Sequence, residues 1–394
     1  MGSKELAGVY VSDLDGTPPV RVLDGSEHAL FAPAATPNAP GHLLFRRQEV
    51  LMAQPFDVKQ LRAFGEMFPV ADRVGVGNTG HGAFAVSATG VLAYSEQSSN
   101  RVVLTWVDRS GRRIGTVAGR LSLGGFEISP DERSVVYASG ETGGRRDLWL
   151  QATGSGSPSR FTFGDGSTGW TMPHWSGGGT RLVYATQNVA GEARYEIRTR
   201  RVDRTSPEET LAGNPDVLRL WDSSPDGRYL LYSCSGQPGL LLLSLKHGSE
   251  PGKVTTASAQ GCCGQFSPDG RFVAYAAGEG GGSQVFVQPF PLTGALWQIS
   301  TDGGGMPRWR RDGGALYYRA TDGKLMEIPV RPGAGSFEAG APQPLFDGIP
   351  SSNSNTFFTY QPSLDGRRFL VSVIDAGSQS PITVVLNWQG AVRR

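Results

Sequence analysis

Short apolar stretches alternate along the whole chain with clusters of Gly, Pro, Asp and Ser. In the clearest copy this pattern predicts strands over 264–267, 271–277, 284–289 and 296–301, with a tight turn at Asp269-Gly270 between the first two. No stretch has the 3.6-residue period of an amphipathic helix. The pattern therefore predicts a meander of four antiparallel strands.

The meander recurs along the chain. Each copy begins with an aromatic or apolar residue and Ser-Pro-Asp-Gly-Arg or a near relative, followed by a strand that ends in Tyr. The step from Ser129 to Ser176 is 47 residues and that from Ser224 to Ser267 is 43 residues, which is the period of propeller blades. Eight copies begin at or near Ala32, Phe84, Ser129, Ser176, Ser224, Ser267, Arg310 and Ser363.

These repeats predict an all-β fold, a single β-propeller of about eight four-stranded antiparallel blades over residues 1–394. Seven blades, or a fragment of a longer propeller array, are the alternatives. The chain is expected to start and end part-way through a blade, because 9–23 resembles two outer strands and 357–388 resembles the first three strands of a blade. Pairing between these two segments would close the ring and remove an open edge. The strand 9–12 would then be surplus, as in a piece cut from a longer protein.

Charge and hydropathy exclude some partners. Lys and Arg number 37 against 36 Asp and Glu, a net charge of +1, so no long-range field attracts nucleic acid or an anionic membrane. No apolar run is long enough to span a membrane, and the segment 1–11 has no signal-peptide core. We therefore expect a soluble monomer without a signal peptide, a membrane span, membrane contact or nucleic-acid binding.

The motifs of common enzymes are missing. The sequence has no GxSxG, HExxH, His-Arg-Asp or Asp-Phe-Gly. The segment 75–80 fits GxGxxG, but the chain continues into a predicted strand rather than the helix that phosphate binding needs. The prediction is a non-enzyme with no catalytic residue and no cofactor.

Metal-binding spacing is missing as well. The three cysteines, Cys234, Cys262 and Cys263, lack paired CxxC spacing. The segment 13–16 resembles the start of a calcium loop without its later acidic ligands. The five histidines are scattered, and although histidines that converge on a propeller axis could hold a metal, no spacing supports it. No metal site is predicted.

Binding is predicted at one mouth of the central channel. In propellers the loops from each fourth strand to the next first strand gather there, and loops on a rigid scaffold commonly carry function. The side chains in these loops best suited to binding a ligand or partner are His81, Trp170, His174, Arg219, Trp221 and Arg308.

The Ser-Pro-Asp-Gly-Arg repeats resemble those of the TolB-like, WD-repeat-like propellers over essentially the whole chain. The stretches 43–57, 86–94, 285–291 and 381–388 are also similar to the C-terminal propeller region of bacterial membrane-bound serine/threonine protein kinases. That resemblance implies a sensor region outside the cytoplasm, in the periplasm, of a kinase-linked parent. Kinase activity is not implied, since the kinase motifs are missing.

The first functional hypothesis is a non-catalytic signalling module that senses a ligand or docks a protein; the ligand could be a protein or a small molecule. A TolB-like envelope interaction protein is one alternative. A propeller lyase or hydrolase with a site in the channel is the other. Several carboxylates or histidines within bonding reach in the channel would favour the enzyme.

Overall fold

The computed structural model describes most of the chain. The described residues are 8–12, 18–25, 28–34, 36, 39–76, 81–96, 101–140, 146–154, 156–163, 172–188, 194–214, 218–234, 237–245, 252–254, 261–278, 282–332, 337–350, 358–375 and 381–391. They form two compact units, residues 101–374 and residues 1–100 with 375–394. The all-β prediction is confirmed, because the described helices are a single 3₁₀ turn at 177–179 and the four-residue α1 (Trp388–Ala391). No helix within the described ranges is long and apolar enough to cross a membrane.

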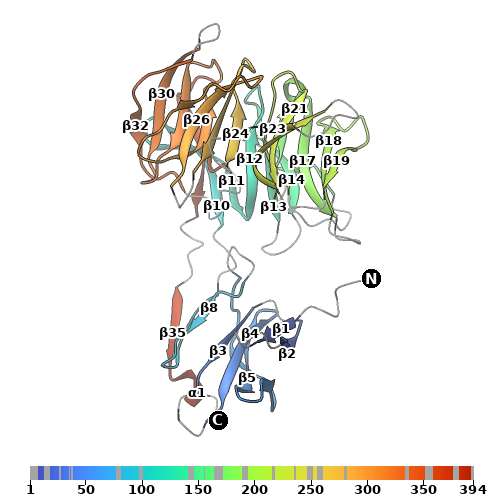
Figure 1. The fold of residues 1–394 in the computed structure, drawn as a ribbon, viewed down its shortest axis with the longest axis vertical. Helices are drawn as coiled ribbons and strands as arrows, with labels where there is room; N and C mark the ends of the chain where they lie inside the picture. The colour runs from blue at the N-terminus through green and yellow to red at the C-terminus, as the bar shows by residue number, and fades with distance from the viewer. Residues whose placement is uncertain are drawn as a thin grey trace. The chain divides into compact units, whose positions relative to one another are not determined.

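The larger unit contains five antiparallel meanders that follow one another along the chain (Figure 1). The first two contain β12 (Leu123–Ile128), β13 (Ser134–Gly140), β14 (Arg146–Ala152), β15 (Ser159–Arg160), β16 (His174–Ser176), β17 (Arg181–Asn188), β18 (Arg194–Arg201) and β19 (Glu209–Asn214). The next two contain β20 (Leu218–Ser223), β21 (Tyr229–Cys234), β22 (Gln237–Ser244), β23 (Gly252–Val254), β24 (Cys262–Phe266), β25 (Phe272–Ala277), β26 (Gln284–Pro289) and β27 (Trp297–Gln298). The fifth contains β28 (Gly305–Trp309), β29 (Ala315–Arg319), β30 (Leu325–Pro332), β31 (Phe337–Ala339) and β32 (Gln343–Phe346).

The sixth sheet joins the two ends of the larger unit and closes the ring. Strands β33 (Tyr360–Pro362) and β34 (Arg368–Ile374) pair with β10 (Val102–Asp108) and β11 (Arg113–Leu121) in the order β11-β10-β34-β33. The β10–β34 register runs without a shift from Val102 opposite Ile374 to Asp108 opposite Arg368. The first strands of successive sheets then follow one another around the ring, with contacts or hydrogen bonds between each strand and the next.

This closure corrects the expectation of pairing between 9–23 and 357–388. The strands β1 (Gly8–Val11) and β2 (Val20–Asp24) pair with each other. The last predicted strand, β35 (Ile382–Leu386), pairs with β9 (Val91–Ser95) of the smaller unit and not with its expected neighbour β34. The reason is packing: Leu370 of β34 lies in one core cluster with Leu104 and Trp106 of β10, so these strands complete an apolar blade.

The expected number of about eight blades in one ring is not confirmed. Six sheets, five of four strands and one of five, make up the described part of 101–374. The two weakest motif copies, near Ala32 and Phe84, belong to the smaller unit. That unit contains β3 (Ala29–Ala32), β4 (Gly41–Arg47), β5 (Val50–Asp57), β6 (Arg62–Ala63), β7 (Phe68–Ala71) and β8 (Phe84–Val86), besides β1, β2, β9 and β35.

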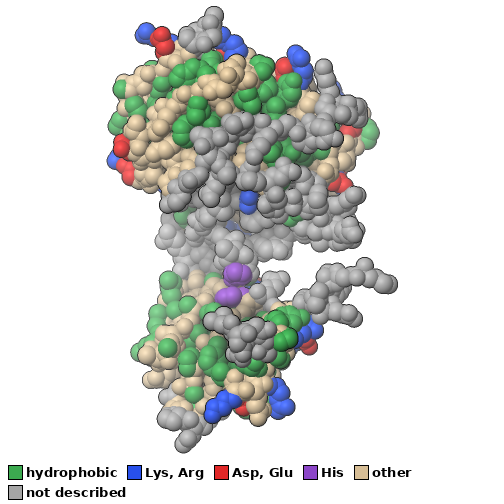
Figure 2. All heavy atoms as spheres, in the orientation of Figure 1, with side chains coloured by type: hydrophobic (Ala, Val, Ile, Leu, Met, Phe, Trp, Pro, Cys, Tyr) green, Lys and Arg blue, Asp and Glu red, His purple; other side chains and the backbone are tan. Residues whose placement is uncertain are grey.

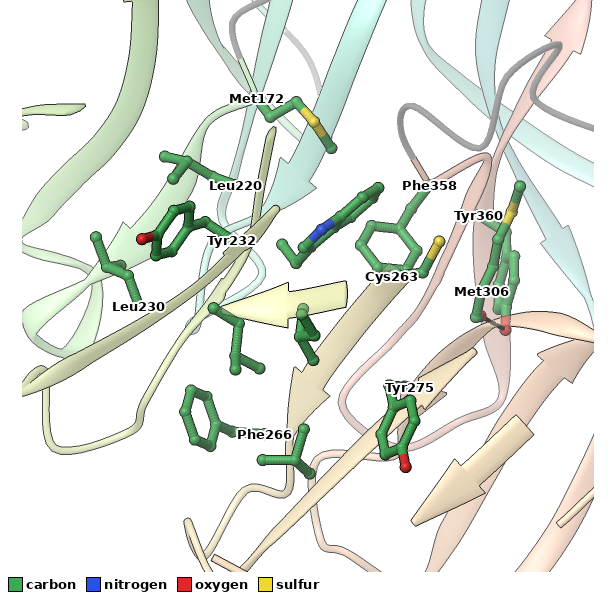
Figure 3. Packing of buried hydrophobic residues seen from close by; sticks show 14 of the residues in the cluster. Met172, Leu220, Leu230, Tyr232, Cys263, Phe266, Tyr275, Met306, Phe358 and Tyr360 are labelled. Carbon is green, nitrogen blue, oxygen red and sulfur yellow. Dashed lines mark hydrogen bonds between the residues drawn. The ribbon is translucent and has the colours of Figure 1, made fainter. Parts of the chain in front are cut away.

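Apolar side chains from neighbouring blades form the core of the larger unit (Figure 3). The tyrosines of the second strands, including Tyr232 and Tyr275, are buried in it. Two blades are joined directly where the Tyr360 hydroxyl donates a hydrogen bond of 2.8 Å to the carbonyl oxygen of Met306. The inner strands are therefore held in a fixed arrangement by both apolar packing and hydrogen bonds.

The Ser-Pro-Asp turns are built alike in several blades. The Ser267 hydroxyl donates to Asp269 Oδ1 at 2.5 Å and accepts the backbone N–H of Phe272 at 2.9 Å. The residue after the aspartate has positive φ, +71° at Gly270, which glycine adopts readily; Glu132 takes the same place in the Ser129 turn with a φ of +57°. The same Ser-to-Asp bond is present at Ser129, Ser224 and Ser363. The sequence prediction that Asp226 and Asp269 stabilise turns agrees with these contacts.

Candidate functional site

Each inner strand places one polar side chain two residues before its turn. Counting back from each turn gives Glu127, His174, Asp222, Gln265, Arg308 and Gln361, one from each of β12, β16, β20, β24, β28 and β33. We call these six residues the channel ring. His174, Arg308 and Gln361 are buried, and the other three are partly buried. Buried polar groups need partners, so the partners of this ring define what it can do.

Four members of the channel ring hold the next blade by a hydrogen bond. Their side-chain oxygens accept the backbone N–H of the residue that follows the ring position in the next blade. The distances are 2.7 Å from Trp175 N to Glu127 Oε2, 2.8 Å from Phe266 N to Asp222 Oδ2, 2.7 Å from Trp309 N to Gln265 Oε1, and 2.8 Å from Ile128 N to Gln361 Oε1. We call these bonds the interblade clamps.

The other two members, His174 and Arg308, do not act as clamps. Arg308 has no acceptor atom, and the residue at the donor position of the next blade is Pro362, which has no N–H. The sequence therefore avoids an unsatisfied donor at that junction. Arg308 instead lies over Phe358, with its guanidinium carbon 3.3 Å from the ring centroid.

The charged members of the channel ring interact. His174 Nδ1 lies 3.4 Å from Glu127 Oε2. Burial and then the nearby Glu127 raise the pKa of Asp222 from 3.8 to about 7, against the opposing charges of His174 and Arg308. Burial alone would lower the pKa of His174, but Glu127 and Asp222 outweigh it and raise that pKa. Near neutral pH a proton can therefore move on or off this cluster.

A cavity of about 300 Å³ opens at the turn end of the inner strands. Five channel-ring residues line it, all except His174, together with turn residues from all six blades. Its rim includes Glu132, Gly178, Pro225, Pro268, Arg311 and Leu364. The cavity is of the size of a small-ligand site, and its lining is a polar ring surrounded by rigid turns.

The serines of the cavity are not arranged as nucleophiles. Ser224 shows the pattern: its hydroxyl proton goes to Asp226, and its oxygen accepts the backbone N–H groups of Arg228 and Tyr229. A nucleophilic serine needs a basic partner such as histidine. These Ser–Asp pairs therefore serve the turns.

The predicted site residues do not all come together. His174 and Arg308 belong to the channel ring. Trp221 is 1% exposed, donates from Nε1 to Ser233 Oγ at 3.0 Å and packs on Phe358, so the expectation of an exposed binding aromatic there is corrected: it fills the core.

Three predicted residues remain. Arg219 is half-buried on β20 and its charge lowers the pKa of Tyr195, against the larger effect of burial. His81 lies in the smaller unit, stacked on His28 at 4.8 Å between ring centroids. Trp170 lies outside the described residues, as do parts of the loops predicted to form the mouth.

Sequence reasoning missed Glu127, Asp222, Gln265 and Gln361. The available signal was the recurrence of a polar residue two positions before every turn, inside otherwise apolar strands. Its meaning was hidden because the residue type changes from blade to blade. Only the ring geometry shows that these different side chains share one place.

Charge on the surface is dispersed. In the view of Figure 2, basic and acidic side chains lie in small groups spread over the described surface, and no large patch of one sign is visible. This agrees with the net charge of +1. Charged side chains are also grouped within single blades, as where Arg198 pairs with Glu196 and Glu208.

The sequence matches no protein family and no curated protein. Among solved structures, the chain is similar to a TolB from Agrobacterium tumefaciens described as putative, at 15% identity over 71% of this chain and 99% of that one, with a TM-score of 0.51. It is also similar to TolB from Acinetobacter baumannii, at 16% identity over 86% and 79% of the two chains (TM-score 0.47), and to oligogalacturonate lyase from Vibrio parahaemolyticus, at 11% identity over 86% and 98% (TM-score 0.47). Similarity at these identities defines the fold alone, and the fold is a TolB-like β-propeller.

Proposed function

We propose that residues 101–374 are a non-catalytic binding module that takes a ligand or a segment of a partner protein into the cavity at the turn face. The observation that carries the proposal is the cavity itself, with the interacting charges of the channel ring at its base and turns from all six blades at its rim. A site built on the inner strands of a closed ring is held rigidly. Such a site loses little conformational entropy when it binds.

Binding is favoured over hydrolysis by the state of the hydroxyl groups. Four turn serines of the described cavity, Ser129, Ser224, Ser267 and Ser363, each donate a hydrogen bond to an aspartate. Acyl transfer needs a nucleophile with a base and an oxyanion site, and the described lining offers no such pair. The two glutamines of the channel ring are neutral and already hold the next blade.

The envelope role and the kinase-linked sensor role are finer proposals. A TolB-like fold supports a protein-interaction module of the cell envelope, which would place this chain in the periplasm. The link to a membrane-bound kinase rests on the sequence stretches named above and remains a prediction. A kinase reading frame beside this gene would support it.

A channel enzyme is the second candidate, and one observation favours it. Glu127, His174 and Asp222 meet in the channel, which is the arrangement expected of a lyase or hydrolase site, and Asp222 has a pKa of about 7. A carboxyl group with that pKa is suited to general acid–base work at neutral pH. Turnover of an acidic oligosaccharide or an ester by the purified chain, lost in Asp222→Asn, would favour the enzyme over the binding module.

The binding proposal is tested by blocking the cavity. A peptide-display library and a metabolite library are selected on the full chain, and the enriched ligands are measured by calorimetry. Leu364→Trp narrows the rim, where the leucine is 38% exposed. The matched control is Leu292→Trp, since Leu292 is 39% exposed and does not line the cavity. We expect about a tenfold or larger loss of affinity in the rim variant only. Equal affinity in both variants would contradict a site in this cavity.

A further inference from the structure

Three metal-ligating side chains converge in the channel ring. Glu127, His174 and Asp222 come from consecutive inner strands, and one ligand atom of each lies within 4.8 Å of the others. Glu127 and His174 are 47 residues apart in sequence, and His174 and Asp222 are 48 apart, so no local motif indicates them. The strands that carry them are fixed by the interblade clamps.

His174 lacks a hydrogen-bond partner at both ring nitrogens, although the residue is only 3% exposed. The oxygen nearest to it, Glu127 Oε2 at 3.4 Å, already accepts the N–H of Trp175 at 2.7 Å. A buried imidazole without partners costs free energy that folding must offset. A ligand bound to one of these nitrogens would remove that cost.

The two carboxylates are already oriented. One oxygen of each is held by a backbone N–H, Trp175 N on Glu127 and Phe266 N on Asp222. The second oxygen of each carboxylate has no hydrogen bond to the rest of the described chain. Hydrogen bonds of this kind fix metal-binding carboxylates in known sites. The clamps thus also act as outer support for a bound ion.

The charge balance leaves room for a cation. Arg308 attracts both carboxylates, but within the described residues it forms no ion pair with either; its guanidinium lies on the Phe358 ring. Two carboxylates in a buried site favour a further positive charge. Arg308 is therefore a competitor at a distance and not a direct partner.

We propose that Glu127, His174 and Asp222 bind a divalent transition-metal ion, with zinc as the best probe. An imidazole nitrogen with two carboxylate oxygens suits zinc better than calcium or magnesium, which take oxygen ligands. Zinc bonds of about 2.0–2.2 Å place donors about 3.4 Å apart, so the 4.8 Å spread must contract by about 1.4 Å. Three protein ligands leave a coordination position open to the cavity. This inference does not depend on the proposed function.

The test measures zinc directly. The full chain is stripped with a chelator, incubated with zinc and passed through a desalting column, and zinc is measured by elemental analysis and calorimetry. We expect about one retained zinc ion per chain. Glu127→Gln keeps an acceptor for Trp175 N and places at this position the residue that two other blades carry. It should weaken zinc binding by about 100-fold or more, and His174→Gln should do the same.

Two controls separate a site from damage. Asp269→Ala removes a turn hydrogen bond and touches neither a proposed ligand nor a clamp, so it should keep zinc affinity. The double variant His28→Gln/His81→Gln removes the stacked histidines of the smaller unit and should also keep it. Cobalt in place of zinc should give visible absorption bands that Glu127→Gln shifts or removes. A chain that retains no zinc, or equal zinc affinity in the wild type, Glu127→Gln and His174→Gln, would overturn the proposal.

Discussion

Two positions of the repeat, four residues apart, behave in opposite ways. The turn aspartate recurs in most blades with the same serine partner, whereas the channel-ring position changes from blade to blade. Asp226 and Asp222 show the contrast within one blade. The Ser224 hydroxyl lowers the pKa of Asp226, while burial raises the pKa of Asp222 to about 7.

The difference separates scaffold from site. A turn that must form in every blade needs the same hydrogen bonds each time, so its residues repeat. A channel-ring residue has only to fit the neighbouring blades, so its type can change from blade to blade and it can be charged where a binding site needs charge. Gln265 and Gln361 form interblade clamps with neutral amide side chains, whereas Glu127 and Asp222 form them with carboxyl groups that can carry charge.

The largest effect should come from the core residue beside the ring. Trp221→Ala removes a side chain that is 1% exposed and packs on Phe358. The free energy of unfolding should fall by about 3–5 kcal/mol, measured by urea denaturation. An unchanged free energy of unfolding would show that Trp221 does not belong to the core.

The second prediction uses pH in chelator-treated protein. The pKa of Asp222 is higher in the folded chain, about 7, than its ordinary value of 3.8, so folded protein binds the extra proton and stability falls as pH rises from 4 to above 7. His174, with its raised pKa, adds a decline in the same direction. The fall should be of the order of 1–4 kcal/mol, and Asp222→Asn should reduce it. The variant leaves Glu127 and Arg308 unchanged, so the charges that surround position 222 remain the same.

Asp226→Asn is the paired variant for that experiment. Its lowered pKa stabilises the folded chain above the unfolded pKa, and this contribution is lost as pH falls through the acid range. The variant should therefore be less stable than the wild type near neutral pH, and the decline of stability at acid pH should be smaller in the variant. If both variants changed the same pH range, the contrast between turn and ring would be refuted.

The third prediction concerns a clamp without charge. Gln265→Ala leaves the backbone N–H of Trp309 without its acceptor at 2.7 Å. The unfolding free energy should fall by about 1–3 kcal/mol. Gln265→Glu restores an acceptor and should recover part of the loss. No change in Gln265→Ala would show that the clamp is dispensable.

The smallest effect should come from a single turn. Asp269→Ala removes the partner of the Ser267 hydroxyl and of the Arg271 N–H. Stability should fall by about 0.5–2 kcal/mol without a change in zinc or ligand affinity. A loss of binding at unchanged melting temperature would place Asp269 in a site.

The fold could be predicted from the sequence as far as local rules reach. Strand alternation and the Ser-Pro-Asp turns are local, and they were enough for an all-β propeller and for the strand 284–289, which matches β26. Ring closure was not local. Strands β10 and β11 carry no Ser-Pro-Asp turn motif, and their partner β34 lies at the other end of the unit. The spacing of the motif copies therefore gave no sign that two of them belong to the smaller unit.

The site was predicted only in part for the same reason. His174 and Arg308 were selected from the sequence, but their ring partners were not, because contacts such as that of Gln361 with Ile128 form only across the closure of the ring. Trp221 was predicted to bind a ligand because it is an aromatic residue near a loop, but in the structure it is buried in the core. Contacts between blades depend on the fold and cannot be read from one strand.

The central claim is that the binding site is made by the charged residues of the channel ring, which stand where other blades carry a neutral glutamine. The direct test is a uniform ring, with Glu127→Gln, His174→Gln, Asp222→Asn and Arg308→Gln combined, assayed for binding of the ligands selected on the wild-type chain. Buried charges are replaced by neutral groups that can still act as clamps, so the variant should fold with its melting transition preserved and should bind neither ligand nor zinc. Wild-type affinity for the selected ligands in a folded uniform ring would contradict the account.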